Sequence, residues 1–193
     1  MSREESLKII LNQLDEKTVI VSTTGKTSRE IFEIRERNNS QHNRDFLTVG
    51  SMGHCSSIAL GIALTSPKTK VICIDGDGAL IMHMGILLTI EKVAPKNFYH
   101  ILLNNYVHES VGSQKTGSEN IDMPKLFSSN NYNKIYSTSS KRELIEIFPD
   151  FIHSNGPNFL EMKIKPGSRK ELGRPTIKPI DNKKAFQAFI NKT

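Results

Sequence analysis

The sequence is poor in cysteine and lacks tryptophan. Its only cysteines, Cys55 and Cys73, form no CxxC motif, which argues against an iron–sulfur cluster or a structural zinc site. We expect both to be buried thiols of a cytoplasmic protein. No apolar run approaches the roughly 20 residues of a membrane span, and the charged N-terminus lacks the apolar core of a signal peptide. These absences predict a protein that does not associate with membranes.

The charge of the chain is unevenly distributed. Of 193 residues, 24% are charged and 37% are hydrophobic, which suits one globular domain with a substantial core. The formal net charge is +6, and residues 161–184 hold eight basic but only three acidic side chains. Because this segment shows neither interleaved aromatic residues nor a helix-turn-helix pattern, we do not expect nucleic-acid binding. A solvated tail, an anionic small substrate or an acidic partner surface would each explain it.

Helix and strand patterns alternate along the chain. We expect strands at residues 18–22, 71–74, 98–103, 134–136 and 159–164. We expect helices at residues 4–14, 29–37, 57–64, 79–94, 124–130, 140–153 and 181–191. The alternation predicts an α/β fold, a doubly wound, mainly parallel sheet flanked by helices, with its ligand site beyond the strand C-termini. We place this domain at residues 1–165 and a basic, proline-containing extension ending in a helix at residues 166–193.

Polar residues follow two of the predicted strands where each strand ends. Gly76-Asp77-Gly78 closes one apolar run, and Asn104-Asn105 closes the next. Parallel strands joined by a crossover helix would bring Asp77 and Asn105 to the same edge of a sheet. One carboxylate and one amide oxygen suit Mg²⁺. The glycines let the backbone approach phosphate groups closely, and a following helix N-terminus favours their negative charge.

Two glycine-containing segments do not match the motifs of nucleotide-binding loops. Gly25-Lys26-Thr27 follows a strand, but Ile20 stands where a Walker loop requires glycine. Gly76 to Ile81 ends in isoleucine where the dinucleotide fingerprint has its third glycine.

Residues 106–122 form a long polar segment that we interpret as a loop, and loops of that length inside a compact domain are usually functional.

Read together, the segments resemble a known family. Residues 22–30, 50–54, 76–78, 104–114, 167–175 and 182–183 occur in the order typical of thiamine diphosphate (ThDP)-dependent decarboxylases. The set is similar to the C-terminal half of phosphonopyruvate decarboxylases and to the sulfopyruvate decarboxylase beta subunit. The resemblance extends over nearly the whole chain.

This resemblance implies a set of cofactor ligands. Asp77 and Asn105 would bind Mg²⁺ through their side chains, and Val107 would bind it through its carbonyl group. The ThDP diphosphate would lie against residues from two segments, Thr24, Gly25, Lys26, Gly76, Gly78 and Ala79.

The aminopyrimidine end of ThDP would contact another segment, residues 50–52. Gly50 would accept a hydrogen bond from the 4′-amine, with Ser51 beside it. Met52 would wedge beneath the cofactor and force its bent conformation, since a thioether fills irregular gaps well. The alternative for Met52 is an ordinary core methionine.

Three further residues are candidate catalytic groups. His108 and Glu109 would face the cavity above the cofactor, where histidine, or a glutamate whose pKa is raised by burial, can exchange protons. The alternative is that both only order a surface loop. His54 would reach substrate or cap its turn. We expect His83, Met82 and Met84 to be packing residues.

The arginines of the tail have two possible interpretations. Arg169 and Arg174 have guanidinium groups suited to a phosphonate or carboxylate. We expect them instead to pair with carboxylates across a subunit boundary.

The resemblance also implies a split enzyme. A pyrimidine-binding alpha subunit would supply the catalytic glutamate, in a hetero-oligomer with two or more copies of each chain. The expected reaction converts phosphonopyruvate to phosphonoacetaldehyde and CO₂. The alternatives are a sulfopyruvate decarboxylase beta subunit, another ThDP enzyme subunit such as acetolactate synthase, and a non-catalytic ThDP-binding assembly subunit.

Overall fold

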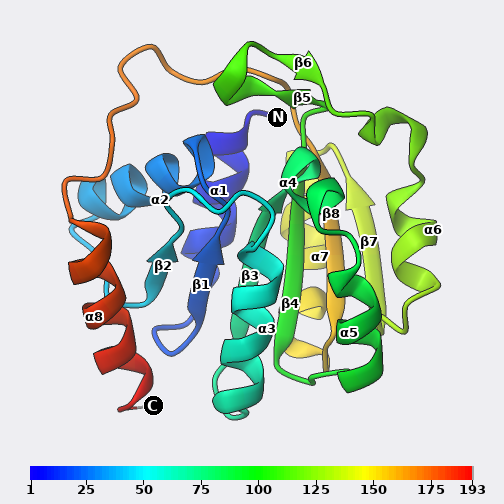
Figure 1. Ribbon diagram of the computed structural model, residues 1–193, viewed down its shortest axis with the longest axis horizontal. Coiled ribbons are helices and arrows are strands. Elements are labelled where there is room, and N and C mark those ends of the chain that lie inside the picture. Colours follow the sequence, from blue (N-terminus) through cyan, green and yellow to red (C-terminus); the bar gives the residue numbers. More distant parts are fainter. Residues whose placement is uncertain (193) are drawn as a thin grey trace.

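The computed structural model describes residues 1–192 and contains one six-stranded parallel sheet (Figure 1). The strands are β1 (Val19–Ser22), β2 (Asp45–Leu47), β3 (Val71–Gly76), β4 (Phe98–Asn104), β7 (Lys134–Thr138) and β8 (Asn158–Lys163). Their order is β2-β1-β3-β4-β8-β7, and every neighbouring pair is parallel. The chain therefore winds outward in both directions from β1 and β3, and the predicted doubly wound fold is confirmed.

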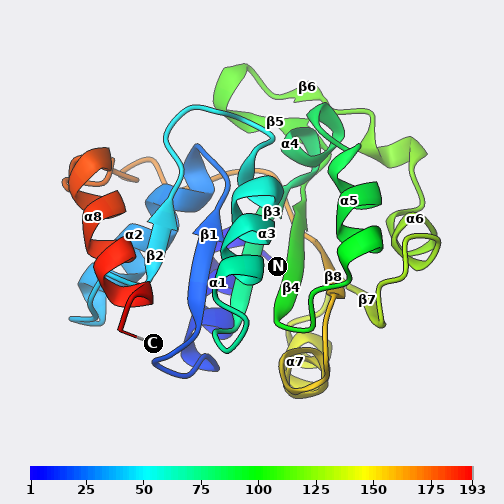
Figure 2. The same cartoon turned by 60° about the horizontal axis from the view of Figure 1, so that its bottom comes forward.

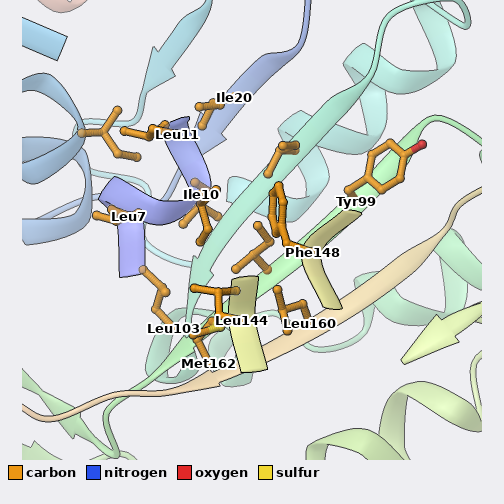
Figure 3. Close-up of a cluster of buried hydrophobic side chains, with 14 of the residues drawn as sticks. Leu7, Ile10, Leu11, Ile20, Tyr99, Leu103, Leu144, Phe148, Leu160 and Met162 are labelled. Atoms are coloured by element: carbon orange, nitrogen blue, oxygen red, sulfur yellow. The ribbon is translucent and has the colours of Figure 1, made fainter. Parts of the chain in front are cut away.

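Helices cover both faces of the sheet (Figures 1 and 2). One face carries α1 (Arg3–Asn12), α2 (Lys26–Arg37) and α7 (Lys141–His153). The other carries α3 (Cys55–Thr65), α4 (Asp77–Met82), α5 (Ile86–Val93) and α6 (Met123–Ser128). Figure 3 shows Leu7, Ile10 and Phe148 of the first face gathered around the sheet. Burial on both faces explains why the central strands are continuous apolar runs.

The predicted crossover helix at 79–94 is wrong in one respect, because it is two helices. α4 ends at Met82 and α5 starts at Ile86, with Gly85 as its N-cap. In one continuous helix Gly85 would be an interior residue, where glycine costs about 1 kcal/mol relative to alanine, whereas at the N-cap it is tolerated. Met82 is 55% exposed, so its predicted packing role is also wrong, whereas Met84 packs against the core.

The long segment predicted as a loop at 106–122 is partly ordered. It contains a short antiparallel hairpin of β5 (Val107–His108) and β6 (Gln114–Lys115). Two 3-10 helices, η1 (Glu109–Val111) and η2 (Ser118–Asn120), complete the segment. The hairpin lies above the carboxyl ends of the strands (Figure 1).

The C-terminal extension crosses the top of the sheet and ends in α8 (Pro179–Ile190) beside β2 (Figure 1). Asn182 joins α8 to this edge strand: its side chain accepts a hydrogen bond from Leu47 N at 3.0 Å and donates one to the Asp45 carbonyl at 2.8 Å. The boundary between domain and extension at residue 165 stays a prediction. Among residues 1–192, none of the helices has both the length and the apolar character of a membrane span.

Arg169 in this extension pairs inside its own chain. Its Nε lies 2.7 Å from Glu4 of α1, and its Nη2 pairs with Glu33 of α2. The prediction that Arg169 bridges two subunits is therefore wrong. These carboxylates are already positioned on adjacent helices of the same face, so the arginine can satisfy both without a partner chain.

Candidate active site

A cavity of about 260 Å³ opens at the carboxyl ends of β1, β3 and β4. This is the edge of a doubly wound sheet at which ligands bind. Predicted site residues that line it are Thr24, Gly25, Lys26, Met52, Gly76, Asp77, Gly78, Ala79, Asn105, Val107, His108 and Glu109. The fold therefore brings most of the predicted residues together, although they come from four separate segments.

Asp77 lies at the first position of α4, directly after β3, and is buried. Its Oδ2 accepts hydrogen bonds from Thr116 Oγ1 at 2.6 Å and Ser118 Oγ at 2.8 Å. Both hydroxyls belong to the segment that follows the hairpin. They fix the orientation of the carboxylate. Neither hydroxyl donates to the other carboxylate oxygen, Oδ1.

Asn105 directly follows β4 and is oriented by two contacts. Its Nδ2 donates to Glu109 Oε2 at 3.1 Å, and its Oδ1 accepts from Val107 N at 3.2 Å. Because the amide nitrogen is tied to a carboxylate, the amide oxygen is the atom available to a cation. Val107 itself lies on β5, paired with Lys115.

Two glycines allow the backbone to pass closely around the cavity. A Cβ on Gly78 would lie 2.4 Å from His108 Cε1, so the histidine ring lies directly against the backbone there. Gly25 has φ +95° and is the N-cap of α2 without any side-chain cap. The first amides of α2, a helix of 12 residues, are thus free of a capping side chain at the rim of the cavity.

Glu109 is the centre of an ionic network. Arg3 Nη1 and Lys26 Nζ each donate to its carboxylate at 2.8 Å. Burial by itself would raise the pKa of Glu109, but the hydrogen bonds from Lys26 and Arg3 outweigh it, and the pKa lies below its usual value. Arg3 also pairs with the buried Glu30, through Nε at 2.9 Å. The expected proton exchange at Glu109 required a raised pKa, whereas Arg3 and Lys26 lower the pKa of this carboxyl group.

The segment around Met52 is only partly in the cavity. Met52 lines it and is half-buried. Gly50 and Ser51 are exposed, have positive φ values of +72° and +48°, and do not line the cavity. Gly50 N nevertheless donates a hydrogen bond to Thr24 Oγ1, a lining residue, at 3.1 Å. His54 also lies outside the lining.

The ring of His54 lies instead against His83, with ring centroids 4.3 Å apart. Both histidines are exposed. His54 thus does not meet the other candidate catalytic groups within residues 1–192, and His83 contacts a second ring rather than filling the core.

Three important residues were not predicted from the sequence: Arg3, Thr116 and Ser118. Thr116 and Ser118 could have been flagged only as hydroxyls in a segment expected to be functional. Arg3 gave no signal, because it lies 106 residues from Glu109 in the chain.

The donor set fits a divalent cation that carries phosphate groups. It offers a carboxylate oxygen and an amide oxygen, the preferred ligands of Mg²⁺. Beside them lie uncapped amides of α2 and a glycine backbone with space for phosphate oxygens. This arrangement is the one expected for the diphosphate end of ThDP.

Comparison with known proteins gives the same family. Residues 23–162 match the family model described as thiamine pyrophosphate enzyme, C-terminal TPP binding domain. A phosphonopyruvate decarboxylase of Streptomyces viridochromogenes is 35% identical over 189 residues, covering 98% of this chain and 46% of that protein. The sulfopyruvate decarboxylase subunit beta of Methanocaldococcus jannaschii is 32% identical over 192 residues, covering 99% of this chain and 98% of that protein.

The two kinds of relative differ in length. This chain spans less than half of the phosphonopyruvate decarboxylases that it matches, at 46% of each. A solved structure from Mycobacterium smegmatis, described as thiamin diphosphate-dependent, superposes with a TM-score of 0.67 over 86% of this chain and 32% of that protein. At 16% identity, that likeness shows the fold alone. The family match over residues 23–162 and the curated relatives together show that this chain belongs to the thiamine pyrophosphate enzymes, as their C-terminal TPP-binding domain.

Proposed function

We propose that this chain is the beta-type subunit of a split, ThDP- and Mg²⁺-dependent 2-oxo acid decarboxylase. The proposed reaction converts phosphonopyruvate to phosphonoacetaldehyde and CO₂. The observation that carries the proposal is the convergence of Asp77, Asn105 and Gly78 in one cavity at the ends of β3 and β4.

In this proposal the chain's own residues hold the cofactor. Asp77 and Asn105 bind Mg²⁺ through their side-chain oxygens, with the Val107 carbonyl as a third ligand. The diphosphate lies against the residues that line the cavity at its two glycine-containing segments, namely Thr24, Gly25, Gly76, Gly78 and Ala79. When bound, ThDP accepts the electron pair that is released as CO₂ departs.

The aminopyrimidine end is proposed to lie at the other side of the cavity. Gly50 and Ser51 contact it from the rim, and Met52 supports the bent conformation from below. The positive φ values of Gly50 and Ser51 turn this segment sharply before α3, which is consistent with a loop shaped for a ligand.

The candidate proton-handling residues divide into two roles. His108 lies against Gly78 in the cavity lining and is the group proposed to move a proton. Glu109 remains ionised because Arg3 and Lys26 lower its pKa, so it orients the Asn105 amide. A role for His54 is proposed only in the assembled enzyme, because within this chain its ring lies against His83.

The subunit organisation is proposed from the shorter relatives. Proteins named sulfopyruvate decarboxylase subunit beta match this chain over 95–99% of their own length. We infer a pyrimidine-binding partner that supplies the catalytic glutamate, in a cytoplasmic hetero-oligomer with two or more copies of each chain.

Sulfopyruvate is the second candidate substrate. Identity to two phosphonopyruvate decarboxylases is 35% and 36%, against 30–34% for the sulfopyruvate decarboxylases, which supports the phosphonate. Another ThDP enzyme subunit and a non-catalytic assembly subunit are the remaining alternatives.

The test is turnover in the complete complex. The chain would be co-expressed with a pyrimidine-domain subunit, supplied with ThDP and Mg²⁺, and assayed for CO₂ release from phosphonopyruvate, sulfopyruvate and pyruvate. Asp77→Ala should abolish both turnover and Mg²⁺-dependent ThDP binding. Asp181→Ala, which removes an exposed carboxylate from α8, is the matched control and should retain both. Wild-type turnover in Asp77→Ala would contradict the assignment.

A further inference from the structure

A second cavity, of about 320 Å³, lies beside the first. The two share Thr24 and Gly25, at the end of β1. The second cavity lies between α2, the segment that follows β2, and the C-terminal extension. Two arginines line it, Arg29 from α2 and Arg174 from the extension, and no acidic residue does.

These two arginines differ from all the others in the sequence. The chain has eight arginines, and six of them donate side-chain hydrogen bonds to a carboxylate or a carbonyl group. Within residues 1–192, Arg29 and Arg174 make no such hydrogen bond and no ion pair. An arginine carries up to five N–H donors and a permanent charge, so two unpaired guanidiniums on one cavity form a site for an anion.

The start of α2 adds to this positive field. Helix N-termini favour acidic residues in the first turn, because the helix dipole is positive there. α2 has no acidic residue in its first turn, and Lys26 and Arg29 lie at its start. Lys26 is neutralised by Glu109, whereas Arg29 is not neutralised by any residue from 1 to 192. The ThDP diphosphate is proposed to lie at the first amides of α2, so a second anion is indicated by Arg29, which lines the second cavity and not the first.

The position of Arg174 is fixed from both sides. Directly before it, Gly173 N donates to Glu33 Oε1 at 2.7 Å. After it, Asn182 holds α8 against β2 through Leu47 N and the Asp45 carbonyl. The extension therefore holds Arg174 in the lining of this cavity, between two anchoring points.

We propose that Arg29 and Arg174 bind the tetrahedral anionic headgroup, phosphonate or sulfonate, of the 2-oxo acid substrate. This inference rests on the proposed function. Charged hydrogen bonds from guanidinium forks suit an oxyanion with three equivalent oxygens. The two cavities share Thr24 and Gly25 as lining residues, so the second cavity adjoins the proposed cofactor site.

The experiment compares arginine variants in the complete complex with both subunits, ThDP and Mg²⁺. The variants are Arg29→Ala, Arg174→Ala and Arg174→Lys, which keeps the charge but loses the fork. Lys170→Ala is the matched control, because it removes an exposed positive charge from the same extension outside the cavity. Thermal melting of each complex shows whether the extension is still folded.

We expect each alanine variant to raise KM for the preferred anionic substrate. The ratio of kcat/KM for that substrate over pyruvate should fall by about 10- to 100-fold, the range for losing one charged hydrogen bond. Inhibition by methylphosphonate should weaken in parallel, and Arg174→Lys should be intermediate.

Two other outcomes separate the two proposals. If the wild-type complex turns over phosphonopyruvate or sulfopyruvate and both alanine variants behave like Lys170→Ala, the headgroup site is refuted and the proposed function stands. If the wild-type complex releases no CO₂ from any of the three acids, the proposed function fails and the headgroup site fails with it.

Discussion

Replacing Arg3 with methionine tests the ionic network beneath the active site. The Arg3 side chain is 6% exposed and joins two carboxylates, Glu30 at 2.9 Å and Glu109 at 2.8 Å. Methionine keeps most of the aliphatic volume but leaves the Glu30 carboxylate, 2% exposed, without its cation. Breaking a buried ion pair in this way costs about 3–5 kcal/mol, because a desolvated charge is left uncompensated.

The assay is the free energy of unfolding at pH 7, measured with urea. Since domains are stable by roughly 5–15 kcal/mol, the expected loss would be a large fraction of the total. Arg142→Met is the matched control: its pair with Glu146 is 2.9 Å long but 89% and 59% exposed, so its loss should cost less than about 1 kcal/mol.

The dependence of this loss on pH has a defined sign. The pKa of Glu109 is lowered in the folded chain, so its contribution to stability is present above the unfolded pKa and is lost as pH falls through the folded pKa. Arg3 supplies part of that lowering, and the variant should lose this part. The stability difference between wild type and Arg3→Met should therefore shrink between about pH 7 and about pH 3. A cost equal to that of Arg142→Met, or a difference that grows in acid, would refute the reasoning.

Two further predictions concern the backbone and the extension. Gly25→Ala should lower the free energy of unfolding by about 1–3 kcal/mol, because φ is +95° there and a Cβ would lie 3.1 Å from Ser110 Oγ. Gly61→Ala is the control: this glycine lies inside α3 and a Cβ would meet no atom within 4 Å, so the free energy of unfolding should rise by about 0.5–1 kcal/mol. Urea unfolding of both variants checks this, and equal effects would count against it. Asn182→Ala should cost about 2 kcal/mol, since it removes two hydrogen bonds to β2. Amide hydrogen exchange should then quicken at Leu47, and unchanged protection there would disprove the anchoring role.

The sheet could largely be predicted because its central strands are buried on both faces. Every residue of β4 is buried, so the apolar run 98–103 was sufficient to identify it. β2 could not be identified in the same way, because it has three residues and begins with Asp45. That carboxylate is buried against Arg35, with distances of 2.8 and 3.0 Å, and this partner is known only once α2 is docked.

The candidate site was predictable only where it depends on strand ends. Asp77 and Asn105 follow β3 and β4 directly, so parallel pairing alone brings them to one edge. The hydroxyls that hold Asp77 come from residues 39 and 41 positions away, across a hairpin that is too short and polar to be recognised. Glu109 was expected to exchange protons, but that depended on a pKa that Arg3 and Lys26 control from distant parts of the chain.

The basic extension shows why net charge alone does not separate structural from ligand-binding roles. The sequence gives Arg169 and Arg174 the same surroundings, a polar segment between prolines. In the folded chain Arg169 forms ion pairs with Glu4 and Glu33, and these pairs hold the extension against α1 and α2. Arg174 instead lines a cavity together with Arg29, and none of the residues from 1 to 192 forms an ion pair with it. Arg174 is exposed and therefore solvated in this chain, and an anion bound between it and Arg29 would add charged hydrogen bonds to both. The headgroup proposal places the substrate's anion at Arg174, whereas pairing with a carboxylate of a partner subunit, the role expected from the sequence, stays a prediction.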